Sequence, residues 1–279
     1  MAQFIARSER FDLVASTNDV VRSWLQDGEP EVCLAVADEQ SAGRGRDGRT
    51  WSAPARAALL LSVGFRPSWL AAAQLWRLAA SVSLAMAEAG ESIADLPDRS
   101  IRLKWPNDLV VEAGAGVRKL AGVLGESTGI GTDDPRVVIG IGVNGDWPAD
   151  AFPADLAGTM TSLRALAGGR PIDHAMLLDA FVERLEGRIL ALRDGRFDVD
   201  EWADRQVTTG RDVVLIAPDG DAMTVRALGV DPSTGVLLVA DPTVDGGRRA
   251  VVVGEIRHVR LPAISETTAT SPAAAQTRV

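Results

Sequence analysis

The stretch Ser41-Ala42-Gly43-Arg44-Gly45-Arg46-Asp47-Gly48-Arg49-Thr50-Trp51 holds three glycines and three arginines within eleven residues. Glycine lets a backbone turn tightly, adopt positive φ and approach a ligand closely. The planar guanidinium groups between the glycines match the oxygens of phosphate and carboxylate. The stretch therefore predicts a flexible anion-binding loop, with a solvated surface loop as the alternative. Residues elsewhere in the chain decide between the two.

The composition sets limits on the function. With 279 residues and 46% hydrophobic content, the chain can form one large domain and a small one. Its net charge of −9 argues against broad binding to nucleic acid or to a membrane surface. The single cysteine, Cys33, lies in an apolar run and cannot form an intrachain disulfide. We expect a buried, inert thiol in a reducing compartment. One cysteine and two histidines are too few for a protein-built zinc site.

The sequence predicts neither a secretory signal nor a membrane span. Charged residues break the N-terminal segment where a signal peptide needs an unbroken apolar core. Polar residues interrupt the longest apolar stretch, at 70–89. We therefore expect a cytoplasmic protein.

Periodicity predicts alternating helices and strands over the first two hundred residues. Apolar spacing and capping residues favour helices at 16–28, 70–89 and 173–192. Apolar or alternating runs favour strands at 32–37, 59–65, 101–105, 109–111, 119–126 and 136–143.

Beyond Trp202 the pattern changes to short strands separated by turns, which is typical of a small β-barrel. The boundary falls near 205–211, and the Ser/Thr/Ala/Pro-rich end is typical of a disordered tail. The predicted division is 1–207, 208–262 and 263–279. The predicted barrel strands are 213–216, 224–228, 236–239, 249–253 and 256–261.

Four further stretches accompany the loop. In chain order they are Ser16-Thr17-Asn18, Lys104-Trp105-Pro106-Asn107-Asp108, Lys119-Leu120-Ala121-Gly122-Val123-Leu124-Gly125-Glu126 and Gly140-Ile141-Gly142-Val143-Asn144. Each is weak alone. Together with Gly43-Arg44-Gly45-Arg46-x-Gly48-Arg49-x-Trp51, the set closely resembles the bacterial biotin protein ligases (biotin–acetyl-CoA-carboxylase ligases). The resemblance covers roughly residues 13–200, and the barrel more loosely.

The resemblance implies a fold and a reaction. The fold is α+β: a catalytic domain akin to the class II aminoacyl-tRNA synthetases, with a mixed or antiparallel sheet, followed by a small SH3-like β-barrel. In the implied reaction, biotin and ATP give biotinyl-5′-AMP, and a lysine of a biotin carboxyl carrier protein then takes the biotin. Mg²⁺ is expected on the ATP phosphates, with no protein ligand assigned.

The resemblance also implies a biotin site. The ureido ring of biotin offers two N–H donors and one carbonyl acceptor, which suit short neutral side chains. N-capping of a helix is the alternative role for Ser16 and Thr17, and both roles can coexist. Glycines in the two strands leave room for the bicyclic ring, with a β-bulge or tight sheet packing as the alternative. The implied biotin-binding residues are Ser16, Thr17, Asn18, Gln40, Gly43, Arg44, Arg46, Lys119, Gly122 and Gly142.

Three residues are implied to be catalytic. Lys119 bridges the biotin carboxylate and the α-phosphate and stabilises the charge that develops there; a solvated hairpin lysine is the alternative. Arg46 belongs to a loop that closes over the reactive intermediate and excludes water. Asp108 orients or deprotonates the acceptor lysine. The loop arginines together hold the carboxylate, the α-phosphate and the departing pyrophosphate, and the sequence does not assign them individually.

A nucleotide site is implied beside these residues. Trp51 is expected to contact adenine through its apolar ring, and the Asn144 amide to pair with a base edge. For Asn107 the alternative is an ordinary Pro-Asn-Asp turn. Glu126 is interpreted as structural. The implied ATP-binding residues are Arg46, Arg49, Trp51, Lys104, Asn107, Lys119 and Asn144.

The chain departs from the family in its N-terminal region. Only fifteen residues precede Ser16, too few for the helix-turn-helix domain of the members that also act as repressors. We therefore expect no DNA binding, no membrane partner, and a monomer or weak homodimer. The Asp146-Trp147-Pro148 segment has no interpretation from sequence.

Two other functions remain as alternatives. Lipoate ligases and octanoyl transferases share the fold, but the intact Arg/Gly loop with Lys-Trp-Pro-Asn-Asp favours biotin. A nucleic-acid-binding Arg/Gly element attached to an SH3-like module is disfavoured by the acidic composition.

Overall fold

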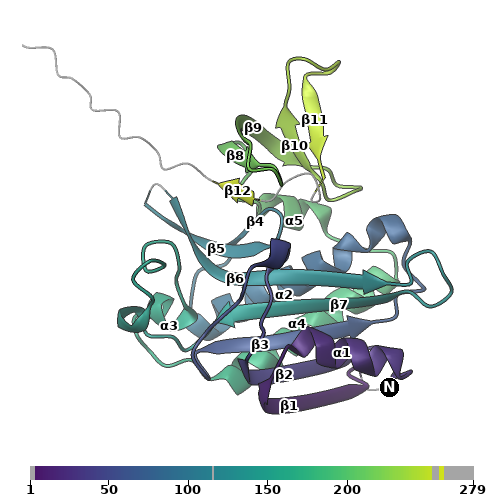
Figure 1. The fold of residues 1–279 in the computed structure, drawn as a ribbon, viewed down its shortest axis with the longest axis vertical. Helices are drawn as coiled ribbons and strands as arrows, with labels where there is room; N and C mark the ends of the chain where they lie inside the picture. The colour runs from purple at the N-terminus through teal and green to yellow at the C-terminus, as the bar shows by residue number, and fades with distance from the viewer. Residues whose placement is uncertain (1–3, 115, 253–257, 261–279) are drawn as a thin grey trace, which may run out of the picture.

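A computed structural model describes residues 4–114, 116–252 and 258–260. A seven-stranded sheet forms its centre, and only the pair β1 and β2 is parallel (Figure 1). The sheet is therefore mixed, as predicted. In spatial order its strands are β1 (Arg7–Val14), β2 (Cys33–Gln40), β3 (Ala58–Phe65), β7 (Arg136–Asn144), β6 (Gly116–Thr128), β5 (Asp108–Ala113) and β4 (Ile101–Lys104).

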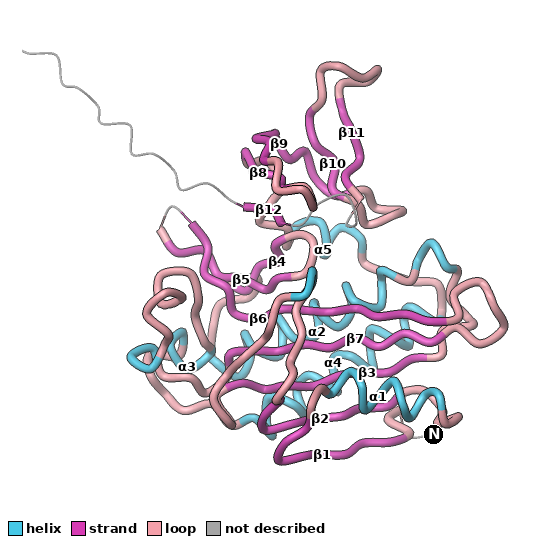
Figure 2. Tube along the Cα trace, viewed as in Figure 1, coloured by secondary structure: helices cyan, strands magenta, loops and turns pink. Residues whose placement is uncertain are grey.

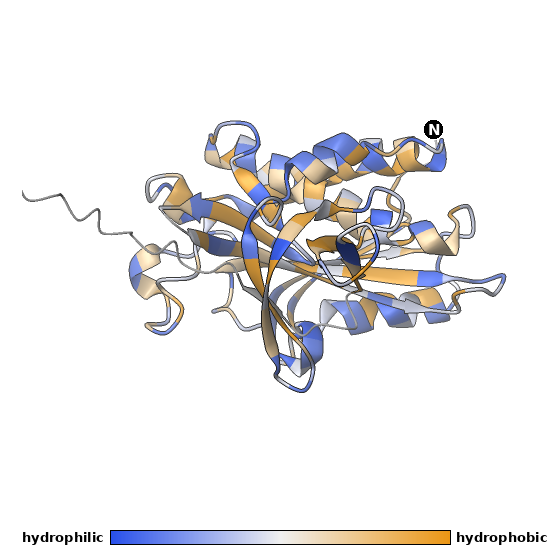
Figure 3. Cartoon of the chain, turned by 90° about the horizontal axis from the view of Figure 1, so that it is seen from above, coloured by the Kyte–Doolittle hydropathy of each residue, from blue (hydrophilic) through white to orange (hydrophobic). Residues whose placement is uncertain are grey.

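Helices cover both faces of the central sheet. Helix α1 (Thr17–Gln26) packs over β2 and β3, whereas α2 (Trp76–Ala94) and α4 (His174–Arg193) pack together on the opposite face (Figures 1 and 2). Hydrophobic and hydrophilic segments alternate along the helices, as expected where one face of a helix meets a sheet (Figure 3). The remaining helical segments are α3 (Leu163–Leu166), α5 (Val199–Asp204) and the 3₁₀ turns η1 (Arg46–Gly48), η2 (Ala72–Gln74) and η3 (Ala149–Ala151).

The alternation of side chains along β3 divides the core in two. Its large residues, such as Leu61 and Phe65, join the main core with α2 and α4. Gly64 lies under α1, where an added Cβ would come within 2.4 Å of a Val21 methyl group. Cys33 belongs to the smaller core beneath α1, and burial raises the pKa of its thiol to about 11. This supports the predicted buried, inert thiol.

A second sheet of five strands stands at one end of the molecule, beyond β4 and α5 (Figure 1). The chain enters it through 205–207, where Val207 N donates to Leu103 O beside β4. The turn between its second and third strands docks on the larger part, because Trp105 Nε1 donates to Gly235 O at 3.0 Å. The strands are β8 (Asp212–Ile216), β9 (Ala222–Val230), β10 (Leu237–Ala240), β11 (Arg248–Val251) and β12 (His258–Arg260).

Most predicted elements are confirmed, with three differences. Strand β1 was not predicted, and neither were the short helices α3 and α5. The second helix starts at Trp76 rather than residue 70, because residues 72–74 form a separate 3₁₀ turn. The predicted tail at 263–279 lies outside the described residues. Within the described ranges, no helix is both long and apolar enough to cross a membrane.

Candidate active site

Small residues form a flat floor on the α1 face of the sheet. In the strand register Gly122 pairs with Gly142, and Ser62 pairs with Gly140. Other side chains lie directly on this floor: a Cβ at Gly140 would stand 2.2 Å from Asn18 Oδ1. Three adjacent strands thus leave space above the sheet while their other faces fill the main core.

A cavity of about 740 Å³ opens above the floor. The N-terminus of α1, the Arg/Gly loop, the β4–β5 corner and strands β6 and β7 contribute to its walls. All predicted site residues except Gly43 and Asn144 line it. They are Ser16, Thr17, Asn18, Gln40, Arg44, Arg46, Arg49, Trp51, Lys104, Asn107, Asp108, Lys119, Gly122 and Gly142.

The Arg/Gly loop is a hairpin. Trp51 N donates to Gly43 O at 2.9 Å, and Gly45 N donates to Arg49 O at 2.7 Å. The arms approach so closely that a Cβ at Gly43 would stand 2.4 Å from Trp51 O. Gly43 is therefore required by backbone contact, which explains its place outside the cavity lining. At the tip, Gly48 has a φ of 72°, a conformation that glycine adopts without strain.

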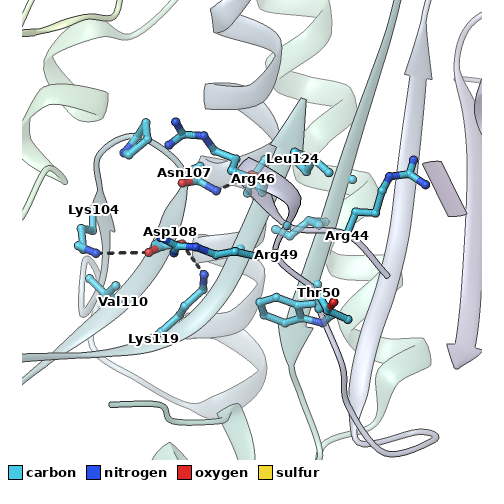
Figure 4. Close-up of a pocket in the computed structure, with 18 of the residues that line it drawn as sticks. Arg44, Arg46, Arg49, Thr50, Lys104, Asn107, Asp108, Val110, Lys119 and Leu124 are labelled. Carbon is cyan, nitrogen blue, oxygen red and sulfur yellow. Dashed lines mark hydrogen bonds and ion pairs between the residues drawn. The ribbon is translucent and has the colours of Figure 1, made fainter. Parts of the chain in front are cut away.

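Arg44 ties the loop to α1. Its guanidinium donates to both carboxylate oxygens of Asp19, at 2.7 and 2.8 Å, and approaches Glu126 at 3.3 Å. The hydrogen bond to Asp19 raises the pKa of Arg44, and the same bond lowers the pKa of Asp19. Arg44 points away from the place where Asp108 and Lys119 meet (Figure 4). Arg44 therefore anchors the loop to α1 in this structure, and its contact with biotin stays a prediction.

A compact charge cluster lies at the β4–β5 corner. Asp108 Oδ1 is 2.6 Å from Lys119 Nζ, and Asp108 Oδ2 is 3.5 Å from Lys104 Nζ. Burial alone would raise the pKa of Asp108, but the two ammonium groups outweigh it and lower that pKa. Burial lowers the pKa of Lys104. Arg49 extends toward Asp108 from the loop (Figure 4).

The cluster combines one carboxylate with two lysines and a nearby arginine. An excess of positive charge at one end of a cavity attracts anionic groups. The Lys119 side chain is 39% exposed, which leaves it accessible to a ligand, whereas Asp108 is only 13% exposed. Burial also lowers the pKa of Arg46 in the same wall. The cavity therefore has a cationic end suited to phosphate and carboxylate oxygens.

Asn107 and Asn144 both make structural hydrogen bonds. Asn107 Nδ2 donates to Val123 O at 2.9 Å, which fixes the turn against β6. Asn144 is 4% exposed and its Nδ2 donates to Thr161 O at 2.9 Å. The neighbouring segment thus engages this amide nitrogen, and Asn144 is not among the residues that line the cavity.

Trp51 occupies the space that the glycines leave. A Cβ at Gly142 would stand 2.6 Å from the indole ring, and one at Gly122 would stand 3.1 Å from it. The Lys119 ammonium lies 5.4 Å from the ring centroid, within reach of a cation–π attraction. The buried indole Nε1 has no hydrogen-bond partner in the described part of the chain. The space expected to hold the ring of biotin is therefore filled here by an indole.

Neutral polar groups line the opposite end of the cavity. Ser16 stands at the N-cap of α1, yet its side chain makes no capping hydrogen bond. The capping alternative is thus not realised by this hydroxyl. Thr17 N donates to Gln40 Oε1 at 2.7 Å. Ser16, Thr17 and Gln40 all line the cavity, as the resemblance implies.

Several residues at the cavity were not predicted from the sequence to belong to the site. Ser62 is fully buried behind Thr17 and Asn18, and its signal was a lone hydroxyl in an otherwise apolar strand. The segment 156–159 lines the cavity rim, and Lys119 N donates to Thr159 O at 2.7 Å. No sequence pattern marks this segment, because the contact joins distant parts of the chain.

The Asp146-Trp147-Pro148 segment is structural. Trp147 is 5% exposed and packs edge-on against Phe152. Asp146 Oδ1 accepts from Ile172 N at 3.0 Å, while Asp146 N donates to His174 Nε2 at 3.1 Å. His174 is therefore a neutral structural acceptor at the start of α4, and its burial lowers its pKa.

Comparison with known proteins identifies the family. The Biotin/lipoate A/B protein ligase family matches residues 11–144. The biotin–[acetyl-CoA-carboxylase] ligase of Mycobacterium tuberculosis is 30% identical over 258 residues, which cover 90% of each chain. The chain belongs to the biotin protein ligase family. The corresponding ligase of Paracoccus denitrificans is 31% identical over 224 residues, 79% of this chain and 88% of its own.

Solved structures support the fold of this biotin protein ligase family member. The biotin protein ligase from Aquifex aeolicus in complex with biotin and ATP superposes with a TM-score of 0.71. It is 23% identical, and the match covers 92% of this chain and 99% of the other. The α+β architecture with a mixed sheet is thus confirmed.

Proposed function

We propose that the chain uses ATP to activate biotin as biotinyl-5′-AMP and transfers the biotin to a lysine of a biotin carboxyl carrier protein. One observation carries the proposal within this family. A single cavity has neutral hydrogen-bonding groups at one end and the Lys104–Asp108–Lys119 cluster at the other. Biotin has the same polarity, with an uncharged ureido ring at one end and a carboxylate at the other.

In the first step, a carboxylate oxygen of biotin attacks the α-phosphorus of ATP. The bond from that phosphorus to the oxygen bridging to the β-phosphate breaks, and pyrophosphate leaves. Lys119 lies beside both anions and stabilises the charge that develops between them. Arg46 and Arg49 extend the positive wall over the phosphates. We assign Asn144 to the structure of β7. The proposed nucleotide contacts are Arg46, Arg49, Trp51, Lys104, Asn107 and Lys119.

In the second step, the carrier lysine attacks the activated carbonyl, an amide forms and AMP leaves. A carboxylate whose pKa is lowered is a weak proton acceptor at neutral pH. Asp108 therefore orients the incoming amine and Lys119 rather than acting as a base. This favours the first of the two roles considered for Asp108.

Magnesium fits this site only as a partner of the nucleotide. Among the described residues, no cluster of three or more histidine, cysteine or acidic side chains is arranged to hold a metal. The cavity lining includes the carboxylates of Asp47 and Asp108, and the second is engaged by two lysines. Mg²⁺ would thus be held mainly by phosphate oxygens and water, and would neutralise phosphate charge.

We also propose a division into modules. Residues 1–207 form the catalytic domain, related to class II aminoacyl-tRNA synthetases, and 208–262 form an SH3-like barrel followed by a tail at 263–279. The separate five-stranded sheet, entered through the connection at 205–207, supports this division. We further propose a cytoplasmic monomer or weak homodimer that does not bind DNA.

Biotin-dependent exchange of pyrophosphate into ATP by the purified chain tests the function. Thermal unfolding gives a second test, since ligands that bind only the folded state raise Tm. At about one hundred times the Kd, a ligand adds about 2.7 kcal/mol to the free energy of unfolding. Biotin with Mg·ATP should raise Tm, whereas lipoate or an oligonucleotide should not. Stabilisation by lipoate instead would favour the related lipoate ligases.

The Arg46→Gly variant is expected to release biotinyl-5′-AMP at least about tenfold faster than the wild type, a difference of about 1.4 kcal/mol. Arg46 lies in the η1 turn of the hairpin and lines the cavity, so it belongs to the segment that we propose closes over the intermediate. Rapid filtration after one turnover, without carrier, measures the release.

Arg56→Gly is the matched control for this variant. Arg56 follows the loop, its side chain is 75% exposed, and its φ of 63° suits glycine. The control should retain wild-type release. Equal release from Arg46→Gly and the wild type would remove Arg46 from the closure of the site.

A further inference from the structure

A series of hydrogen bonds runs along the floor of the cavity from a carboxylate to the polar end of the site. Asn18 Nδ2 donates to Glu126 Oε2 at 2.9 Å. The Ser62 hydroxyl lies 2.5 Å from Asn18 Oδ1 and 2.7 Å from Thr17 Oγ1. Thr17 in turn contacts Gln40 through its backbone N–H at 2.7 Å. The sequence interpretation left Glu126 as structural and did not include Ser62.

The Glu126 carboxylate determines which group donates and which accepts in the hydrogen bonds that follow it. An ionised carboxylate only accepts, so Asn18 must turn its amide nitrogen toward Glu126. Asn18 Oδ1 then faces Ser62, and it has no proton to give. The single proton of Ser62 must therefore point at Asn18.

The same logic extends to the residues that line the cavity. With its proton committed to Asn18, the Ser62 oxygen can only accept. The Thr17 hydroxyl lies 2.7 Å from Ser62 Oγ and 3.1 Å from Gln40 Oε1, and Gln40 Oε1 already accepts from Thr17 N–H, so the shorter contact to Ser62 takes the Thr17 proton. Thr17 thereby keeps its remaining lone pair as an acceptor. Gln40 Oε1 is occupied by Thr17 N–H at 2.7 Å, which leaves the Gln40 amide nitrogen as the donor.

We infer that Glu126 and Ser62 are positioning residues that set Thr17 as a hydrogen-bond acceptor for an N–H of a cyclic urea, beside Gln40, whose amide nitrogen donates to the C=O. A ureido group presents an N–H beside a C=O, which is the complement of this pair. The inference rests on the proposed function, because it concerns how biotin is recognised at that site. Neither Glu126 nor Ser62 is among the residues lining the cavity.

Burial strengthens the hydrogen bonds of this series, which we call the relay and which consists of Glu126, Asn18, Ser62 and Thr17. Ser62 is 0% exposed, and Thr17 and Asn18 are each at most 4% exposed, so water does not compete for these hydrogen bonds. Glu126 also forms ion pairs with Arg22, at 2.5 Å, and with Arg44. A site with buried, oriented polar groups rejects analogues whose donors and acceptors are reversed.

Two conservative variants test the relay. Glu126→Gln can offer its amide group in either orientation, and Ser62→Ala removes the linking hydroxyl without changing charge. Each should weaken biotin binding by about tenfold or more, while kcat at saturating biotin and the KM for ATP stay within about twofold. Calorimetry with biotin gives the Kd, and pyrophosphate exchange gives kcat and the KM for ATP.

Selectivity provides the readout that a merely structural role would not change. In a cyclic carbamate analogue an acceptor oxygen replaces the ureido N–H that meets Thr17, so the oriented Thr17 hydroxyl rejects it. Ser62→Ala frees that hydroxyl to donate, and should lower the preference for biotin over the carbamate by about tenfold or more. Arg22→Gln is the matched control, because it removes an ion pair from Glu126 but leaves the Asn18 link. Its Kd and selectivity should stay within about twofold of the wild type.

The experimental outcomes distinguish a failure of the relay proposal from a failure of the proposed biotin ligase function. Wild-type exchange with an unchanged Kd for biotin in both variants would overturn the relay. So would a raised Kd with unchanged selectivity in Ser62→Ala, since that result indicates loss of packing alone. A wild-type chain that neither binds biotin nor shows biotin-dependent exchange would overturn the proposed function, and the relay with it.

Discussion

The Lys119→Ala variant is expected to lose adenylate synthesis, with kcat for biotin-dependent pyrophosphate exchange falling by about 10²–10³. The Lys119 ammonium lies 2.6 Å from Asp108 at the cationic end of the cavity. In the proposed first step this ammonium lies between the biotin carboxylate and the α-phosphate of ATP. Removing it leaves their repulsion unscreened in the transition state. Exchange at saturating biotin and ATP measures the loss.

The second half-reaction distinguishes a chemical defect from a folding defect. When biotinyl-5′-AMP is supplied directly, Lys119→Ala should transfer biotin to the carrier with a smaller loss than it shows in exchange. Arg118→Ala is the control, because Arg118 is an exposed neighbour on the same strand. Normal exchange by Lys119→Ala would remove this lysine from the mechanism.

The three loop arginines show what the sequence could and could not predict. Their clustering with glycine predicted a flexible anion-binding loop, and the structure shows a hairpin that lines the cavity. The sequence could not show that Arg44 has a different role from the other two arginines. That difference depends on Asp19 and Glu126, which lie in other elements and meet Arg44 only in the folded chain.

The fold was predictable where periodicity was strong. Strand β2 is buried along most of its length, so its apolar run was clear in the sequence. Strand β1 is an edge strand with a mostly exposed, charged sequence, and it pairs only with β2. Its pattern resembles a loop, and the partner that makes it a strand is not visible locally. Such strands require the tertiary structure.

The floor of the cavity was predictable in part. Gly122 and Gly142 are unusual in apolar strands, and they predicted open space above the sheet. The occupant of that space in the folded chain, Trp51, was not predictable. The indole arrives there because the hairpin folds back over the sheet. Any ligand ring that uses this floor must take the place of the indole.

The Gly142→Val variant is expected to bind biotin about five- to a hundredfold more weakly, because overpacking at a site built for close contact costs about 1–3 kcal/mol. A Cβ at Gly142 stands 2.6 Å from the Trp51 ring, so the branched side chain fills the space that a ligand ring needs. Calorimetric titration with biotin measures the loss.

Gly125→Ala is the matched control for the floor. It lies on the adjacent strand β6 but on the opposite face, where a Cβ would meet the flexible end of Ile139 at 3.3 Å. This variant should keep the Kd for biotin of the wild type, since the main core can yield there without changing the cavity. If Gly142→Val bound biotin as tightly as the wild type, the ring would have to lie elsewhere in the cavity. The floor would then serve only the packing of Trp51.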